Sequence, residues 1–95
     1  MSRPSREDID RAIRFYEREG YQVDEFKGDD LPWDILCEAL GYKIWVQVFT
    51  DHDRLRKAED LKYPKNVYFE AVKYSPGQEN DVPMNRMIFP SNWKR

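Results

Sequence analysis

The sequence has one cysteine, one histidine and no long apolar run. Cys37 cannot form an intramolecular disulfide, so core packing must hold the domain together, and a reducing, cytoplasmic (intracellular) setting is expected. A single histidine argues against a transition-metal site. No stretch reaches the roughly 20 apolar residues of a membrane span, and the N-terminal MSRPSRED lacks the apolar centre of a signal peptide. We therefore expect no membrane partner.

Several catalytic patterns are also missing: a Ser-His-Asp order, a Gly-rich phosphate loop and a CxxC pair. The net charge is −2, with acidic and basic residues mixed along the chain. Such a balance is not typical of a nucleic-acid coat protein, although a local basic patch remains compatible with it. Aromatic residues make up 15% of the chain, enough to close a small core. The length predicts one domain over residues 1–95.

The first predicted element is a helix over residues 5–19. Ser5 can cap it, with Asp8 three residues later as in a capping box, and Gly20 is a typical C-terminal stop. At helical spacing, the expected buried stripe comprises Ile9, Ala12, Ile13 and Tyr16.

The rest of the chain predicts strands and one further helix. The expected strands cover residues 21–26, 32–38, 42–49, 66–74 and 86–89, and the second helix covers residues 50–61. In the strand 42–49 one face carries Ile44, Val46 and Val48, and the other carries Trp45, Gln47 and Phe49. Such a strand is typical of the centre of a sheet with both faces covered. In the preceding strand, Trp33, Ile35 and Cys37 are expected to share a face.

These elements predict an α/β fold in the order helix, three strands, helix, two strands, with a central mixed β-sheet flanked by helices. The helix ending in Glu-Gly-Tyr, a glycine turn, then PWDILCE and IWVQVF, resembles the PD-(D/E)XK nuclease superfamily. Within it, the run of motifs over residues 5–89 is similar to the archaeal Holliday-junction resolvases. The resemblance implies a restriction-endonuclease-like domain. In such enzymes carboxylates hold Mg²⁺ and a lysine assists the attack of water on phosphorus.

The resemblance transfers poorly to the site residues. Asp34 matches the first metal-binding acid, but Gln47 stands at the second acid and Phe49 at the lysine. The helix glutamate of the family falls near Ile9, with Glu7 and Asp8 close by. Glutamine can still bind a metal through its oxygen, whereas phenylalanine cannot replace a lysine. Lys43, on the same strand face as Gln47, is a candidate relocated lysine.

These residues therefore form a vestigial site, with no catalytic residue assigned and no cofactor expected. If the chain is an active, Mg²⁺-dependent endodeoxyribonuclease, Asp34 and Gln47 are its metal ligands. The simpler interpretation is that Asp34 is a buried acid held by backbone N–H groups or by Gln47. Asp51-His52-Asp53 is interpreted as a helix cap, and Cys37 as a small buried hydrophobe.

Basic residues cluster around the second predicted helix and at the N-terminus. They could contact phosphates without reading sequence, or simply form a solvated face interspersed with Glu59 and Asp60. The candidate nucleic-acid-binding residues are Arg3, Arg6, Arg54, Arg56, Lys57, Lys62 and Lys65.

The leading hypothesis is a DNA-binding pseudoenzyme: a degenerate resolvase-like protein that binds branched or duplex DNA or docks a DNA-processing protein. The resemblance also implies a homodimer. A divergent metal-dependent endonuclease and a pure protein-interaction module remain as alternatives.

Overall fold

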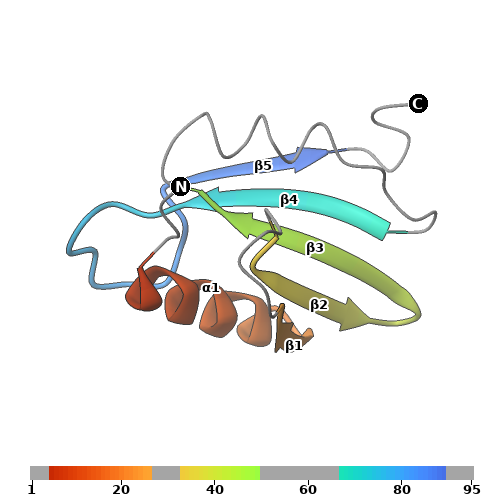
Figure 1. The fold of residues 1–95 in the computed structure, drawn as a ribbon. Coiled ribbons are helices and arrows are strands. Elements are labelled where there is room, and N and C mark those ends of the chain that lie inside the picture. The colour runs from red at the N-terminus through yellow and green to blue at the C-terminus, as the bar shows by residue number, and fades with distance from the viewer. Residues whose placement is uncertain (1–4, 27–32, 50–66, 90–95) are drawn as a thin grey trace.

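The computed structural model describes residues 5–26, 33–49 and 67–89, and the structural statements below concern these residues (Figure 1). The described chain is an α/β domain with one helix and a five-stranded mixed sheet, so the predicted fold class is confirmed at that level. The expected helix over residues 50–61 lies outside the described residues. The elements are α1 (Arg6–Arg18), β1 (Gln22–Glu25), β2 (Ile35–Ala39), β3 (Tyr42–Val48), β4 (Val67–Lys73) and β5 (Asn85–Phe89).

The strands lie side by side in the order β1-β2-β3-β4-β5. β3 and β4 run parallel, and the other three pairs are antiparallel. The parallel register sets Ile44 opposite Tyr68 and Val46 opposite Glu70. Helix α1 covers one face of the sheet (Figure 1). No helix among the described residues is long and apolar enough to cross a membrane.

Helix α1 begins and ends where its sequence signals place it. The Ser5 side chain accepts a hydrogen bond from the Asp8 backbone N–H at 3.2 Å. At the other end, Gly20 adopts φ +99°. The Gly20 N–H donates to the Glu17 carbonyl at 3.1 Å and the Tyr21 N–H to the Tyr16 carbonyl at 3.1 Å. These two bonds form a Schellman motif, which satisfies carbonyls that the last turn leaves free.

The β2–β3 hairpin turns through two residues. Leu40 and Gly41 have φ values of +52° and +84°, and Ala39 pairs directly with Tyr42. Two successive positive φ values match a type I′ turn, whose twist suits the flanking strands. The sequence predicted a three-residue connection that included Ala39. The structure places that residue in the strand instead.

The sheet has a hydrophobic cluster on each face, as the alternation of β3 predicts. The cluster under α1 comprises Ile9, Ala12, Tyr16, Ile35, Cys37, Ile44, Val46, Val48, Val72 and Tyr74. The cluster on the opposite face comprises Trp33, Phe49, Val67, Phe69 and Ala71.

The predicted position of Trp33 is wrong. It was expected to share a face with Ile35 and Cys37, but it packs in the opposite cluster. Strand β2 begins only at Ile35, so the strand alternation does not extend back to Trp33. Ile13, expected in the buried stripe of α1, is only half-buried against the first cluster.

Candidate functional site

The structure brings Asp34 and Gln47 together but encloses them. Asp34 immediately precedes β2, and both it and Gln47 in β3 are 0% exposed, while Phe49 is 6% exposed. The Asp34 carboxylate accepts a hydrogen bond from the Val48 backbone N–H at 2.7 Å. The Asp34 N–H donates to the Val46 carbonyl at 2.9 Å. Asp34 is therefore a buried acid that ties its segment to the end of β3.

Aromatic side chains close the face of the sheet beside this pair. The Trp33 ring lies 5.2 Å from the Phe69 ring and 6.0 Å from the Trp45 ring, centroid to centroid. Phe49 belongs to the same cluster. A Mg²⁺ ion prefers several oxygen ligands and usually keeps some of its waters. One enclosed carboxylate and one enclosed amide do not suit that ion, so the implied metal does not fit this donor set.

The described residues also contain no group of three or more His, Cys, Asp or Glu side chains that could hold a metal. Lys43 lies on the Gln47 face but is exposed where Gln47 is buried. Four strand residues at about 3.3 Å each separate the two backbones by roughly 13 Å. Ile9 is buried in the α1 cluster, so the position nearest the family's helix glutamate is part of the core.

Most predicted DNA contacts lie outside the described residues. Arg6 is described, and its guanidinium pairs with Asp10 at 2.9 Å and with Glu25 at 2.7 Å. The remaining predicted DNA-binding residues lie outside the described ranges: Arg3, Arg54, Arg56, Lys57, Lys62 and Lys65. The predicted Asp51-His52-Asp53 cap also lies outside them.

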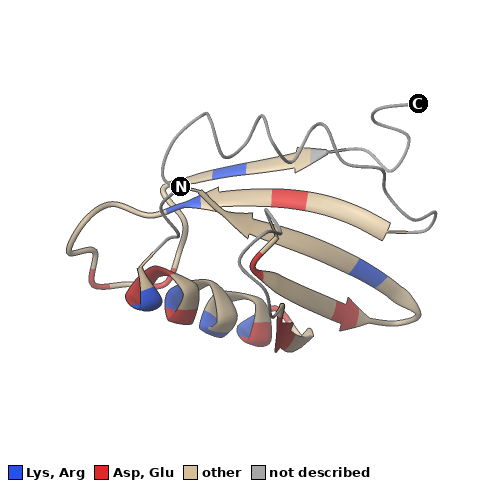
Figure 2. Cartoon of the chain, viewed as in Figure 1, with Lys and Arg blue, Asp and Glu red and all other residues tan. Residues whose placement is uncertain are grey.

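The charges of α1 are largely compensated. Both signs alternate along the helix (Figure 2). Arg11 pairs with Asp8 at 2.7 Å. Arg14 and Arg18 both reach Asp81, at 3.0 and 3.3 Å. Within the described part of the chain, α1 thus offers little uncompensated positive charge for a phosphate backbone.

A second polar centre, which the sequence analysis missed, lies under α1. Glu70 in β4 is only 5% exposed. Its Oε1 accepts a hydrogen bond from the Tyr16 hydroxyl at 2.6 Å and from Arg86 Nε in β5 at 2.9 Å. Burial, and next the charge of Glu70, raise the pKa of Tyr16, so its hydroxyl stays protonated and donates. The available signal was an acid in the middle of the apolar strand VYFEAVK.

Arg86 completes this centre from the edge of the sheet. Its guanidinium carbon lies 5.4 Å from the Phe15 ring centre and 5.7 Å from that of Tyr16. One guanidinium nitrogen also lies 4.0 Å from a Glu19 carboxylate oxygen. Two carboxylates thus face one guanidinium, and the cation is placed over aromatic rings that favour it.

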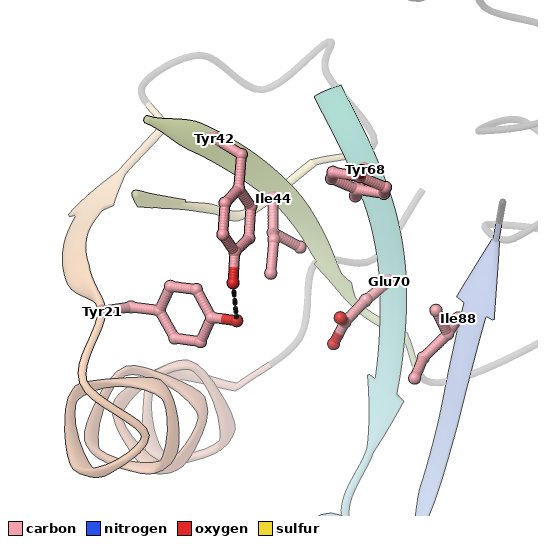
Figure 3. A pocket seen from close by; sticks show the side chains of 6 residues that line it. All are labelled: Tyr21, Tyr42, Ile44, Tyr68, Glu70 and Ile88. Atoms are coloured by element: carbon pink, nitrogen blue, oxygen red, sulfur yellow. Dashed lines mark hydrogen bonds between the residues drawn. The ribbon is translucent and has the colours of Figure 1, made fainter. Parts of the chain in front are cut away.

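A pocket of about 330 Å³ adjoins Glu70. We call it the tyrosine pocket; it is lined by Tyr21, Tyr42, Ile44, Tyr68, Glu70 and Ile88 (Figure 3). The hydroxyl oxygens of Tyr21 and Tyr42 lie 3.0 Å apart and share a hydrogen bond. That contact, and then burial, raises the pKa of Tyr21 to about 12, so the phenol is neutral at physiological pH.

Cys37 is buried, as predicted, and burial raises its pKa to about 12. A thiol in this state is a poor nucleophile because the thiolate is the reactive form.

No family model matches the chain, and neither the curated proteins nor the solved structures provide a match.

Proposed function

We propose that this chain is a catalytically inactive protein of the PD-(D/E)XK nuclease type, resembling the archaeal Holliday-junction resolvases. It binds branched or duplex DNA, or a protein that processes DNA, without cleaving it. One observation carries the proposal: the acid that would start the metal site, Asp34, is fully enclosed and bound to the backbone N–H of Val48.

The replacements at the other two site positions suit a buried environment. An acid at Gln47 would place a second carboxylate in a fully enclosed position, and a lysine at Phe49 would bury an ammonium group. Burying an unpaired charge costs roughly several kcal/mol of folding free energy. Glutamine and phenylalanine avoid that cost. The face that would bind substrate in an active enzyme is thereby used as core.

The proposed DNA contacts come from the basic residues of the 54–65 region. Arg6 is already neutralised by Asp10 and Glu25, and acidic side chains outnumber basic ones in the described ranges. Arg54, Arg56, Lys57, Lys62 and Lys65 would then supply the phosphate contacts. Binding of this kind is insensitive to sequence and weakens steeply as salt rises.

A cleavage assay tests the loss of catalysis. The full chain is incubated with four-way junctions in Mg²⁺ or Mn²⁺, beside Asp34→Ala and the matched Asp34→Asn, which keeps an acceptor for Val48. We expect no product from any of the three. Metal-dependent product from the natural sequence that disappears in Asp34→Ala would overturn the proposal in favour of a divergent endonuclease.

A binding assay tests the DNA partner. Gel shifts with duplex, branched and single-stranded DNA are run at low salt, where phosphate contacts are strongest. Replacing both Arg56 and Lys57 by Ala should weaken binding and reduce the salt slope by roughly two units. Lys43→Ala, which removes an exposed base from β3, serves as the control and should bind as the natural sequence does.

A second candidate function, protein docking, rests on a specific surface. Val82, Met84, Met87 and Ile88 are exposed by 57%, 53%, 39% and 62%, and the last two belong to β5 at one edge of the sheet. Met87 and Ile88 point to opposite faces of β5, and exposed apolar side chains on an edge strand are typical of interaction sites. No DNA binding at low salt would favour this module. Concentration-dependent sedimentation would then show whether the partner is a second copy.

A further inference from the structure

The tyrosine pocket combines aromatic walls with one carboxylate. The Tyr42 ring lies 6.2 Å from the Tyr21 ring at an interplanar angle of 83°, and 5.7 Å from the Tyr68 ring at 84°. The Tyr42 ring is therefore nearly perpendicular to each of the other two rings, and all three line the pocket (Figure 3). Aromatic rings in this arrangement can contact a small ligand from more than one side.

Glu70 supplies a carboxylate to the lining of the pocket. Both hydrogen bonds to the Glu70 carboxylate end on Oε1, and Oε2 accepts none from the described residues. Arg86, which partly neutralises Glu70, does not line the pocket and is itself approached by Glu19 at 4.0 Å. Glu70 therefore brings a carboxylate to the lining of the pocket, beside the three tyrosines.

The remaining walls are apolar. Ile44 from β3 and Ile88 from β5 complete the lining. A ligand that matches this pocket carries a positive charge but exposes methyl groups rather than N–H donors. Quaternary ammonium groups have this chemistry, and aromatic rings bind them through cation–π attraction. Their charge is also spread over a large ion, which lowers the cost of removing it from water.

We propose that the tyrosine pocket binds a quaternary ammonium group through the rings of Tyr21, Tyr42 and Tyr68 and the carboxylate of Glu70. Such a group occurs in small choline-like molecules and in trimethylated lysine side chains. The site lies on the α1 face of the sheet, whereas Gln47 points to the opposite face. The inference uses none of the residues on which the proposed DNA function depends.

The primary test is titration of the full chain with choline, followed by NMR chemical-shift changes. The neutral tert-butyl analogue of choline has the same shape without the charge. We expect saturable shifts at the pocket residues and choline binding about tenfold tighter than the analogue. Equal binding of the two, or no saturable shift with choline, would overturn the proposal.

Tyr68 provides the clearest variant because it is 42% exposed, so its replacement should leave the fold intact. Tyr68→Ala should weaken choline binding roughly tenfold, while Tyr68→Phe, which keeps the ring face, should bind within about twofold of the natural sequence. Val82→Ala, an exposed apolar change outside the pocket, is the matched control. An unchanged spectrum away from the pocket confirms folding in each case. Unchanged binding by Tyr68→Ala would refute the site.

A third arm separates the two sources of the ligand. A short neutral peptide with one trimethyllysine is compared with tetramethylammonium and with the same peptide carrying unmodified lysine. Tighter binding of the methylated peptide assigns the pocket to a modified protein tail. Equal binding of peptide and free cation assigns it to a small molecule. Both results support the site, whereas preference for the unmodified lysine peptide would contradict it.

Discussion

Asp34 shows how one carboxylate can serve the fold from a fully buried position. The position matches a metal-binding acid in the resemblance, yet its side chain here is 0% exposed and accepts the Val48 N–H. A buried backbone N–H left without an acceptor costs about 1–3 kcal/mol. The Asp34 carboxylate therefore contributes to stability by accepting this buried N–H, with no metal involved.

Cys37 allows a prediction at the same scale. Its pKa in the folded protein is raised to about 12, above the value of roughly 8.5 for an unfolded thiol. Below pH ~8.5 the thiol is protonated in both states, so it does not make stability depend on pH. As pH rises from ~8.5 towards 12, only the unfolded state ionises, and the free energy of unfolding falls.

Urea unfolding of the natural sequence at pH 8 and pH 10 should show this loss, and Cys37→Ala should reduce the dependence on pH. The native protein should also react with a thiol reagent far more slowly than the urea-unfolded chain. Rapid modification of the native protein would show that the thiol is accessible.

Among the elements, the β2–β3 hairpin carries a local conflict that can be relieved. Leu40 is 97% exposed and holds φ +52°, a conformation that asparagine adopts more readily than leucine. Leu40→Asn creates the Asn-Gly pair favoured in type I′ turns. We expect it to stabilise the protein by about 0.5–1 kcal/mol, measured by urea unfolding, with Leu40→Ala as the control. A destabilised Asn variant would mean that the leucine makes contacts in the folded protein that its exposure hides.

The loop between β4 and β5 is tied to helix α1 through one acid. Asp81 pairs with Arg14 and Arg18, and its backbone carbonyl accepts the Tyr74 hydroxyl at 2.8 Å. The hydrogen bonds from Arg14 lower the pKa of Asp81. A lowered pKa means that the carboxylate contributes stability above the ordinary value near ~3.9 and loses that contribution as pH falls through its folded value.

Asp81→Asn should therefore unfold at lower urea than the natural sequence at pH 7, and the difference should shrink as the pH approaches ~2. Glu79→Gln, a change at an exposed carboxylate in the same loop, should give little difference at either pH. A constant difference across the whole range would show that Asp81 acts through packing and not through its charge.

For the whole molecule, the Tyr16–Glu70–Arg86 centre joins helix α1 to the neighbouring strands β4 and β5. The hydrogen bonds run from α1 and from β5 to one carboxylate in β4. Hydrogen bonds to charged groups contribute about 1.5–3 kcal/mol each. Because Glu70 is buried, losing one partner also leaves charge poorly solvated.

Tyr16→Phe should accordingly lower the free energy of unfolding by about 2 kcal/mol. Glu70→Gln should lower it as well, and the double variant should lose less than the sum of the two because they share one bond. Ile9→Val, a buried change on the same helix, controls for general packing loss. Strict additivity of Tyr16→Phe and Glu70→Gln would show that the bond contributes nothing.

The sequence by itself determined the local structure. The cap at Ser5, the stop at Gly20, the alternation of β3 and the α/β class could all be predicted, because they depend on periodicity and turn chemistry within a few residues. Trp33 marks the limit: it lies two residues before β2, where no periodicity applies. The sequence left Asp34 open as a metal ligand or as a buried acid, and it gave no sign of the tyrosine pocket. Asp34 is bound where its segment pairs with the end of β3, and the tyrosine pocket depends on the parallel pairing of β3 with β4. Long-range packing decides such a register, and no short stretch encodes it.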